Sequence, residues 1–215
     1  MLVRRTLFRL LRFAFHLFYN PFAFTYDFVS AFVSRGRWRQ WTRAAIPRIT
    51  GMRILEVPCG TGNLQIDMRV AGYTPIGVDL STSMLSITYG KLERLGKRAL
   101  LVRARAQALP FPNGWFDSVV MTFPPGFVYD PSAFGELDRV LDDRGRLIWV
   151  DGAQFKSGVW GRMVNRWIGY VGGEIEFERT IRQVLKDAGL DAQVEWVEDD
   201  MSLVAVAVAT KVKEG

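Results

Sequence analysis

The sequence has very few residues that hold metals or form disulfides. Among its 215 residues there is one cysteine, Cys59, and one histidine, His16. A single cysteine excludes a disulfide framework. A zinc or iron site built from cysteine and histidine needs three or four such ligands. We therefore expect no disulfide and no metal.

The sequence also lacks an uninterrupted apolar run. Residues 1–24, MLVRRTLFRLLRFAFHLFYNPFAF, are rich in Leu and Phe, but arginines interrupt every helical turn. A membrane span needs about 20 consecutive apolar residues, and a secretory signal needs an unbroken apolar segment before a small-residue cleavage site. We therefore expect neither a membrane span nor a secretory signal, and we expect the protein to be cytoplasmic.

Basic residues in this N-terminal segment recur at helical spacing. Arg5, Arg9, Arg12 and His16 form one narrow stripe, and apolar residues fill the rest of the circumference. Asn20-Pro21 then ends the helix. Such a helix is expected to lie on a surface. That surface is either an anionic membrane, which would make the protein peripheral, or the protein's own cleft, which the helix would cap.

Acidic residues are scarce in the first 50 residues, where Asp27 is the only one. The whole chain has 28 basic and 22 acidic residues, a net charge of +6. This surplus suits anionic lipid, nucleic acid or an acidic metabolite, and the total does not choose among them. The run Arg35-Gly36-Arg37-Trp38-Arg39-Gln40-Trp41 resembles a nucleic-acid patch, but it is equally typical of a solvated helix with inward tryptophans.

Apolar residues, in contrast, are abundant at 49%, which is enough for a full core. A helical stretch at about residues 26–46 is followed from Arg53 by alternating buried strands and helices. This alternation predicts a three-layer α/β/α Rossmann-like sandwich with a mostly parallel, seven-stranded sheet. The last two strands, separated by Asp199-Asp200, are expected to form a C-terminal antiparallel hairpin.

Two units are expected along the chain. Residues 1–50 would form N-terminal amphipathic and cap helices, and residues 51–215 would form the main domain. Within that domain, residues 154–173 are rich in Gly, Trp and Arg and follow no regular period. We therefore expect them to be an irregular insertion.

The strongest functional signal is a strand that runs into a glycine turn at a helix start. In Ile54-Leu55-Glu56-Val57-Pro58-Cys59-Gly60-Thr61-Gly62-Asn63-Leu64, the two glycines let the backbone pass close to a ligand. Asp79 ends the next strand, 17 residues after Gly62, where it could accept hydrogen bonds from a ribose. The order strand, turn, helix, strand and acid indicates a nucleotide-type cofactor.

Two features favour S-adenosylmethionine over NAD. A dinucleotide site has a small residue three positions after the second glycine, and here that residue is Gln65. Glu56, at the end of the first strand, would lie awkwardly beside a pyrophosphate but suits a cationic amino-acid group. An NAD enzyme nevertheless remains an alternative.

Four motifs in order resemble those of class I S-adenosylmethionine-dependent methyltransferases, in particular the small-molecule branch similar to quinone-biosynthesis enzymes. They are E-V-P-C-G-T-G-N-L (56–64), G-V-D-L-S-T-S-M-L (77–85), A-Q-A-L-P-F-P-N-G-W-F-D (106–117), and E-L-D-R-V-L (136–141) followed by R-G-R-L (144–147). The resemblance covers about residues 50–150 and implies S-adenosyl-L-methionine as cofactor.

The resemblance also implies roles for particular residues. Glu56 and the turn around Cys59 would lie near the methionine end, Asp79 on the ribose, and Leu80 and Met84 beside the adenine. The full set of expected cofactor-binding residues is Glu56, Pro58, Cys59, Gly60, Thr61, Gly62, Asp79, Leu80, Met84, Arg105, Ala106, Gln107, Thr122 and Phe123.

Two positions depart from the family pattern. Pro58 stands where glycine is usual, and it fits only if the residue keeps a negative φ. Arg105 stands where the family often has an aspartate that binds the adenine amino group. Because arginine has no hydrogen-bond acceptor, adenine recognition must then fall to backbone carbonyls or to Gln107.

The methyl acceptor is less defined by the sequence. We expect a small, apolar, lipid- or quinone-like molecule, with Tyr26 and Tyr129 as candidate contacts if they are not simply packing residues. No catalytic base stands out. Two alternatives remain: an inactive cofactor-binding protein, and an RNA or other nucleic-acid methyltransferase that uses the basic N-terminal region. Phe123-Pro124-Pro125-Gly126-Phe127 resembles a motif of the latter class, but Phe123 lacks the polar group needed there, so we do not expect nucleic acid as a partner.

Overall fold

The computed structural model of the chain describes residues 25–172 and 177–212. Two N-terminal helices and a short 3-10 turn precede an alternating series of strands and helices. The elements are α2 (Tyr26–Val33), α3 (Trp38–Arg43), η2 (Ile46–Arg48), β1 (Ile54–Glu56), α4 (Asn63–Val70), β2 (Ile76–Asp79), α5 (Thr82–Arg94), β3 (Leu101–Arg103), β4 (Phe116–Thr122), η3 (Gly126–Tyr129), α6 (Pro131–Val140), β5 (Leu141–Phe155), α7 (Val159–Gly172), α8 (Phe177–Asp187), β6 (Leu190–Glu198) and β7 (Ser202–Lys211).

All seven strands form one sheet, in the order β3-β2-β1-β4-β5-β7-β6. The first five strands pair in parallel, whereas β7 runs antiparallel to both β5 and β6. The three residues of β1 are all buried, as expected for a strand covered on both faces. The predicted three-layer fold with its C-terminal hairpin is therefore confirmed.

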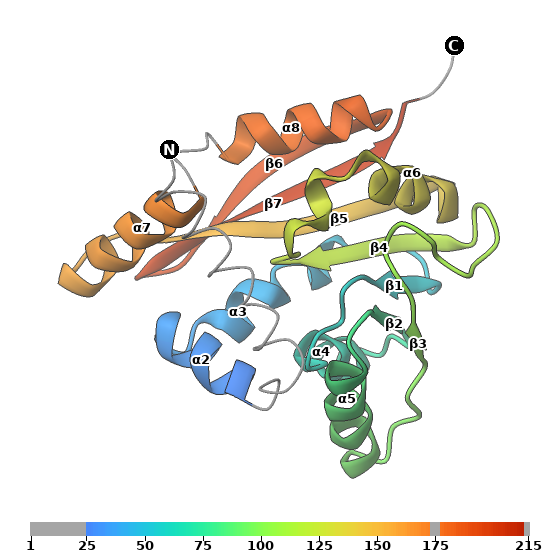
Figure 1. Ribbon diagram of the computed structural model, residues 1–215, viewed down its shortest axis with the longest axis horizontal. Helices are drawn as coiled ribbons and strands as arrows, with labels where there is room; N and C mark the ends of the chain where they lie inside the picture. Colours follow the sequence, from blue (N-terminus) through green and yellow to red (C-terminus); the bar gives the residue numbers. More distant parts are fainter. Residues whose placement is uncertain (1–24, 173–176, 213–215) are drawn as a thin grey trace, which may run out of the picture.

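Helices cover both faces of this sheet (Figure 1). On one face, α6 and α8 bury Phe134, Leu137, Ile181 and Leu185 in a shared apolar core. On the other face, α3, α4 and α7 contribute Trp41, Met68 and Val164 to a second core. Polar side chains begin two of the helices: Ser81 accepts from Met84 N at α5, and Asp130 accepts from Ser132 N ahead of Pro131 at α6.

The helical stretch expected at about residues 26–46 is not continuous, because the chain breaks into α2 and α3. Arg35 and Gly36 both have positive φ, 51° and 80°, and Gly36 N donates to Ala31 O at 2.7 Å. This left-handed turn ends α2. Ser34 then accepts a hydrogen bond from Trp38 N at 2.9 Å, which starts α3 in a new direction.

The irregular structure expected for residues 154–173 is also wrong. Strand β5 continues to Phe155, and α7 occupies most of the remainder. Gly161 permits α7 to pack closely against the end of β5, because a Cβ at this position would lie 2.6 Å from Phe155 Cβ. Asn165 fixes the helix further by bonding both the backbone N and the backbone O of Phe155.

The N-terminal helices are fastened to the sheet domain by an ion-pair cluster. Asp67 on α4, whose side chain is almost fully buried, accepts hydrogen bonds from Arg39 and Arg43 on α3. Burial alone would raise the pKa of Asp67, but the two guanidinium groups outweigh it and hold that pKa below its usual range.

The amphipathic helix expected at residues 1–18 lies outside the described residues. Within the described ranges, none of the helices combines the length and the apolar character needed to span a bilayer.

Candidate cofactor and acceptor site

The turn between β1 and α4 depends on its second glycine. Gly62 has φ +77°, and a Cβ there would lie 2.5 Å from Thr88 Cγ2 on α5. Thr88 Oγ1 donates to Gly60 O at 2.8 Å and so holds the turn against α5. The close approach leaves no room for a side chain at residue 62, which explains the glycine at this position.

Asp79, at the end of β2, lies beside the same turn. Its carboxyl oxygens accept from Gly60 N at 2.9 Å and from Ser81 N at 2.8 Å. Burial raises the pKa of Asp79, and these backbone hydrogen bonds oppose the rise. A carboxylate has about four lone-pair positions, so Asp79 retains acceptor capacity for a ligand diol.

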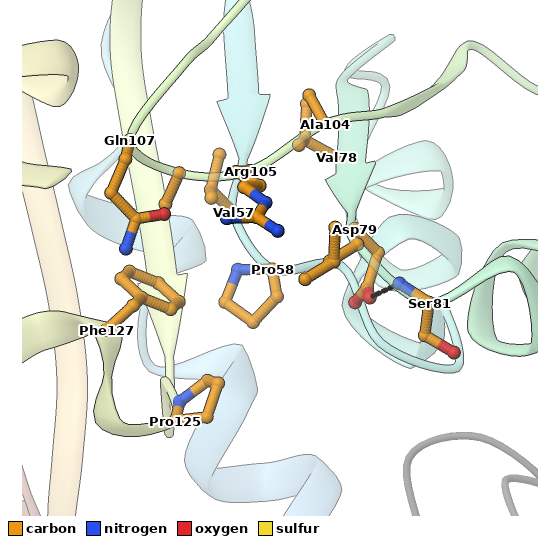
Figure 2. A pocket seen from close by; sticks show the side chains of 12 residues that line it. Val57, Pro58, Val78, Asp79, Ser81, Ala104, Arg105, Gln107, Pro125 and Phe127 are labelled. Carbon is orange, nitrogen blue, oxygen red and sulfur yellow. Dashed lines mark hydrogen bonds between the residues drawn. The ribbon is translucent and has the colours of Figure 1, made fainter. Parts of the chain in front are cut away.

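A cavity of about 460 Å³ opens between the ends of β1, β2 and the segment after β3. Figure 2 shows Asp79 and Ser81 on one side, Gln107 and Phe127 on the other, and Pro58 between them. The wall of this cavity is mostly apolar, with the carboxylate of Asp79 at one end. The lining residues are Val57, Pro58, Val78, Asp79, Leu80, Ser81, Ala104, Arg105, Ala106, Gln107, Pro125 and Phe127.

Gln107 and Arg105 differ in what they offer a ligand in this cavity. Gln107 Nε2 donates to Asp130 Oδ2 at 3.1 Å, and its Oε1 has no hydrogen bond from any described residue. In Figure 2 this oxygen lies on the cavity side of the amide. Arg105 is exposed, and its side chain makes no hydrogen bond or ion pair within the described ranges. Of these two side chains, Gln107 therefore offers a ligand a free acceptor, and Arg105 offers an unpaired cation.

A second, narrower cavity of about 40 Å³ adjoins the first at Pro58. One side is the glycine turn with Glu56, and the other consists of Tyr26, Trp38 and Phe123. Trp38 and Phe123 stack with ring centroids 4.3 Å apart, and Tyr26 meets Trp38 edge-on at 6.1 Å. The complete lining is Tyr26, Trp38, Thr42, Glu56, Pro58, Cys59, Gly60, Thr61, Asn63, Leu64, Thr122 and Phe123.

Glu56 is the buried acid of this second cavity. Burial, and to a smaller extent the nearby carboxylates of Asp79 and Asp67, raise the pKa of Glu56 to about 8. The hydrogen bond that Gln65 Nε2 donates to Oε2 at 2.7 Å opposes this rise. Gln65 Oε1 is also buried and has no partner in the described part of the chain. Gln65, which stands where a dinucleotide site has a small residue, thus holds the carboxyl of Glu56 in place.

Asp27 contacts the glycine turn, although it was not predicted to be a site residue. It accepts hydrogen bonds from Thr61 Oγ1 at 2.6 Å, Asn63 Nδ2 at 2.9 Å and Lys91 Nζ. Burial would raise the pKa of Asp27, but these donors, Lys91 first, lower it overall. No local pattern signals this contact, because α2 and the turn are more than 30 residues apart.

Most of the predicted residues gather around the two cavities, with some exceptions. Met84 is fully buried, and neither Met84 nor Gly62 lines a cavity. The Tyr129 side chain lies outside the described part of the structure. Asp151, within β5, has its pKa raised by burial to about 6, but it lines neither cavity. No cluster of three potential metal-ligating side chains occurs in the described ranges.

The fold and the site together define a class I, Rossmann-like methyltransferase. Residues 54–145 match the family described as "Methyltransferase domain". A demethylmenaquinone methyltransferase of Thermus thermophilus is 34% identical over 149 residues, covering 66% of this chain and 68% of that protein. The chain thus belongs to the S-adenosylmethionine-dependent methyltransferases.

A second sequence relative supports the same family, and a solved structure supports the fold. The ubiquinone/menaquinone biosynthesis C-methyltransferase UbiE of Blochmanniella pennsylvanica is 35% identical over 142 residues, which cover 62% of this chain and 56% of that protein. The match therefore spans little more than half the length of this relative. A Thermotoga maritima methyltransferase structure superposes with a TM-score of 0.67 at 20% identity, covering 92% of this chain and 99% of that one.

The residues present fit S-adenosylmethionine, the cofactor of this family. The larger cavity has apolar walls suited to an adenine ring and a carboxylate suited to a ribose diol. The smaller cavity is lined by an acid, Glu56, and by the hydroxyl-bearing Thr61 and Thr42. The carboxyl of Glu56 suits the cationic amino-acid end of the cofactor.

Proposed function

We propose that this methyltransferase acts on a small, apolar, ring-containing acceptor of the quinol type. The observation that carries this proposal is the aromatic wall of the second cavity, where Tyr26, Trp38 and Phe123 meet the glycine turn. Aromatic rings favour stacked or edge-on contact with another ring. The names of the relatives given above, which act in menaquinone and ubiquinone biosynthesis, support the same acceptor class.

The chain's own residues would act mainly by positioning. When bound, S-adenosylmethionine supplies an activated methyl group on a sulfonium, so the protein has to align the acceptor and exclude water. We propose that Asp79 accepts hydrogen bonds from the ribose of the cofactor and that Gln107 Oε1 accepts one from the adenine amino group. Glu56 would bind the amino-acid end. Residues 51–215 would then form the catalytic domain, and helices α2 and α3 would cap its cleft.

Nucleic-acid methylation and an inactive binding protein are the competing proposals. The basic run at residues 35–41 does not form a continuous free cationic patch, because Arg35 is the only one of its three arginines that is unpaired in the described part of the chain. Arg37 pairs with Asp199 at 2.7 Å, and Arg39 is bonded to the buried Asp67. Trp38 and Trp41 pack inward against Phe123. These contacts favour the small-molecule acceptor.

The acceptor class is tested by methyl transfer. Full-length protein would be incubated with S-adenosylmethionine labelled in its methyl group and with either a quinol lipid extract or total RNA. We expect label in the organic phase of the quinol reaction only. Label in RNA would establish the nucleic-acid alternative, and no transfer to either, despite cofactor binding, would favour the inactive binding protein.

Replacing Arg105 by aspartate should tighten cofactor binding. Arg105→Asp removes an unpaired cation and adds an acceptor for the adenine amino group, for which we expect about 1 kcal/mol, or roughly fivefold. Calorimetric titration with S-adenosylmethionine measures the change. Arg105→Ala is the matched control, since it removes the charge without adding an acceptor. Affinity of Arg105→Asp no better than that of Arg105→Ala would contradict the proposed adenine position.

We also propose that residues 1–18 bind an anionic membrane surface. Arg5, Arg9 and Arg12 lie at helical spacing beside a broad apolar face. Each basic residue near an anionic leaflet contributes about 1 kcal/mol, and inserted Phe and Leu side chains add to this. A membrane-bound enzyme would meet an apolar acceptor where that acceptor partitions.

Vesicle flotation tests this segment. Wild-type protein should float with anionic vesicles at low salt and less at high salt, whereas a chain shortened to begin at Asn20 should float much less. A full-length variant with Arg5, Arg9 and Arg12 changed to glutamate controls for the deletion. If both variants float like wild type, the segment caps the cleft or serves another purpose.

A further inference from the structure

Helices α2 and α7 expose large apolar side chains at the same end of the molecule (Figure 1). On α2, Phe28 and Phe32 are 75% and 61% exposed. On α7, Val159 and Met163 are 74% and 57% exposed. An exposed apolar residue is unremarkable when isolated, but four on two neighbouring helices need an explanation.

The two helices touch, so these residues form one surface. The Phe32 ring meets Trp160 of α7 edge-on, with centroids 5.4 Å apart, and Phe28 stacks on Phe32 at 6.5 Å. Trp160 and Val164 turn inward on α7, which leaves Val159, Arg162, Met163 and Arg166 on its outer face at spacings of three and four residues. We call the four exposed apolar residues together with Arg35, Arg162 and Arg166 the α2–α7 surface.

The charge of this surface is one-sided. Arg35, Arg162 and Arg166 are exposed, and none has a hydrogen-bond or ion-pair partner in the described part of the chain. The sequence of α7 contains no acid, and the only acid of α2, Asp27, is paired with Lys91. Elsewhere in the described ranges several arginines are paired, among them Arg37, Arg39, Arg43 and Arg53. Unpaired cations around exposed aromatic and aliphatic side chains complement an anionic lipid headgroup above acyl chains.

From these observations we infer that the α2–α7 surface docks on an anionic lipid bilayer. Phe28, Phe32, Val159 and Met163 enter the headgroup boundary, and Arg35, Arg162 and Arg166 contact the lipid phosphates. This contact is separate from the one proposed for residues 1–18, because it is made by the folded body. Tyr26 on α2 lines the second cavity, so docking would bring the bilayer close to the aromatic wall of the acceptor site.

The test uses full-length protein and vesicles of phosphatidylcholine mixed with phosphatidylglycerol. The variant Phe28→Glu with Met163→Glu changes one residue on each helix. Its matched control is Val70→Glu with Leu95→Glu, two residues of similar exposure, 80% and 52%, on α4 and just after α5. We expect the ratio of vesicle-bound to free protein to fall about tenfold in the α2–α7 variant and to stay at the wild-type value in the control.

A second variant tests the charges. With Arg35, Arg162 and Arg166 changed to glutamine, binding to anionic vesicles should fall while any weak binding to pure phosphatidylcholine vesicles stays the same. Thermal unfolding and methyl transfer to a detergent-dispersed acceptor should be unchanged in all three variants. These controls separate a failure of this inference from a failure of the proposed enzymatic function.

Three results would overturn the inference. The first is wild-type flotation by the Phe28→Glu, Met163→Glu variant, and the second is a wild-type protein that does not float. The third is a change of oligomeric state in that variant, seen by light scattering without loss of flotation, which would make the surface a contact between copies of this chain.

Discussion

Replacing Asp79 by alanine is expected to weaken S-adenosylmethionine binding about 10- to 150-fold. The carboxylate would lose its hydrogen bonds to the ribose hydroxyls, and bonds to a charged group contribute about 1.5–3 kcal/mol. Titration calorimetry of the wild type and the variant measures the difference. The change should appear in affinity without loss of the fold, since the sheet around β2 is built from backbone hydrogen bonds.

A matched variant separates ligand binding from turn geometry. Asp79 also accepts from Gly60 N and Ser81 N, so alanine loosens the glycine turn as well. Asp79→Asn keeps one carbonyl acceptor and should retain an intermediate affinity. Unchanged affinity in Asp79→Ala would mean that the ribose does not lie at the end of β2.

Replacing Glu56 by glutamine should remove a large pH dependence of stability. The pKa of Glu56 is raised from 4.5 to about 8 in the folded protein, chiefly by burial. Between these two pH values the folded protein keeps a proton that the unfolded chain releases. The free energy of unfolding therefore falls by about 1.4 kcal/mol per pH unit as the pH rises through this window.

The difference between variant and wild type isolates this one group. Glutamine cannot ionise and can still accept from Gln65 Nε2, so Glu56→Gln should gain stability over the wild type by on the order of 4 kcal/mol between pH 4.5 and 8. Urea unfolding at several pH values across the window measures the gain. A difference that stays constant with pH would show that Glu56 is ionised in the folded protein.

Glu56 should also couple cofactor binding to pH. A cationic ligand beside this carboxyl favours its ionised form. Below pH 8, where Glu56 of the free protein carries a proton, cofactor binding therefore releases that proton. Wild-type affinity should accordingly tighten as the pH rises toward 8, and Glu56→Gln should lose that part of the dependence.

The sequence predicted the fold and the cofactor turn because both rest on local patterns. The glycines around residue 60 and the acid at residue 79 lie on consecutive elements, and parallel strands bring their ends to one edge of the sheet. The antiparallel hairpin followed from two apolar strands and a short polar turn. These features need no information from distant parts of the chain.

The features that were missed depend on contacts between distant residues. Helix α7 was not predicted because Gly161 lowers helix propensity, yet that glycine permits close packing on Phe155. Asp27 was not assigned to the site because its partners Thr61, Asn63 and Lys91 come from the glycine turn, α4 and α5. The break after α2 depends on a left-handed turn at Arg35, a conformation that arginine rarely adopts.

The most direct test of the central claim is calorimetric titration of the purified full-length protein with S-adenosylmethionine and, separately, with NAD. We predict saturable binding of S-adenosylmethionine, weakened by Asp79→Ala, and no binding of NAD. Absence of S-adenosylmethionine binding to the wild type, or binding of NAD in its place, would contradict the account.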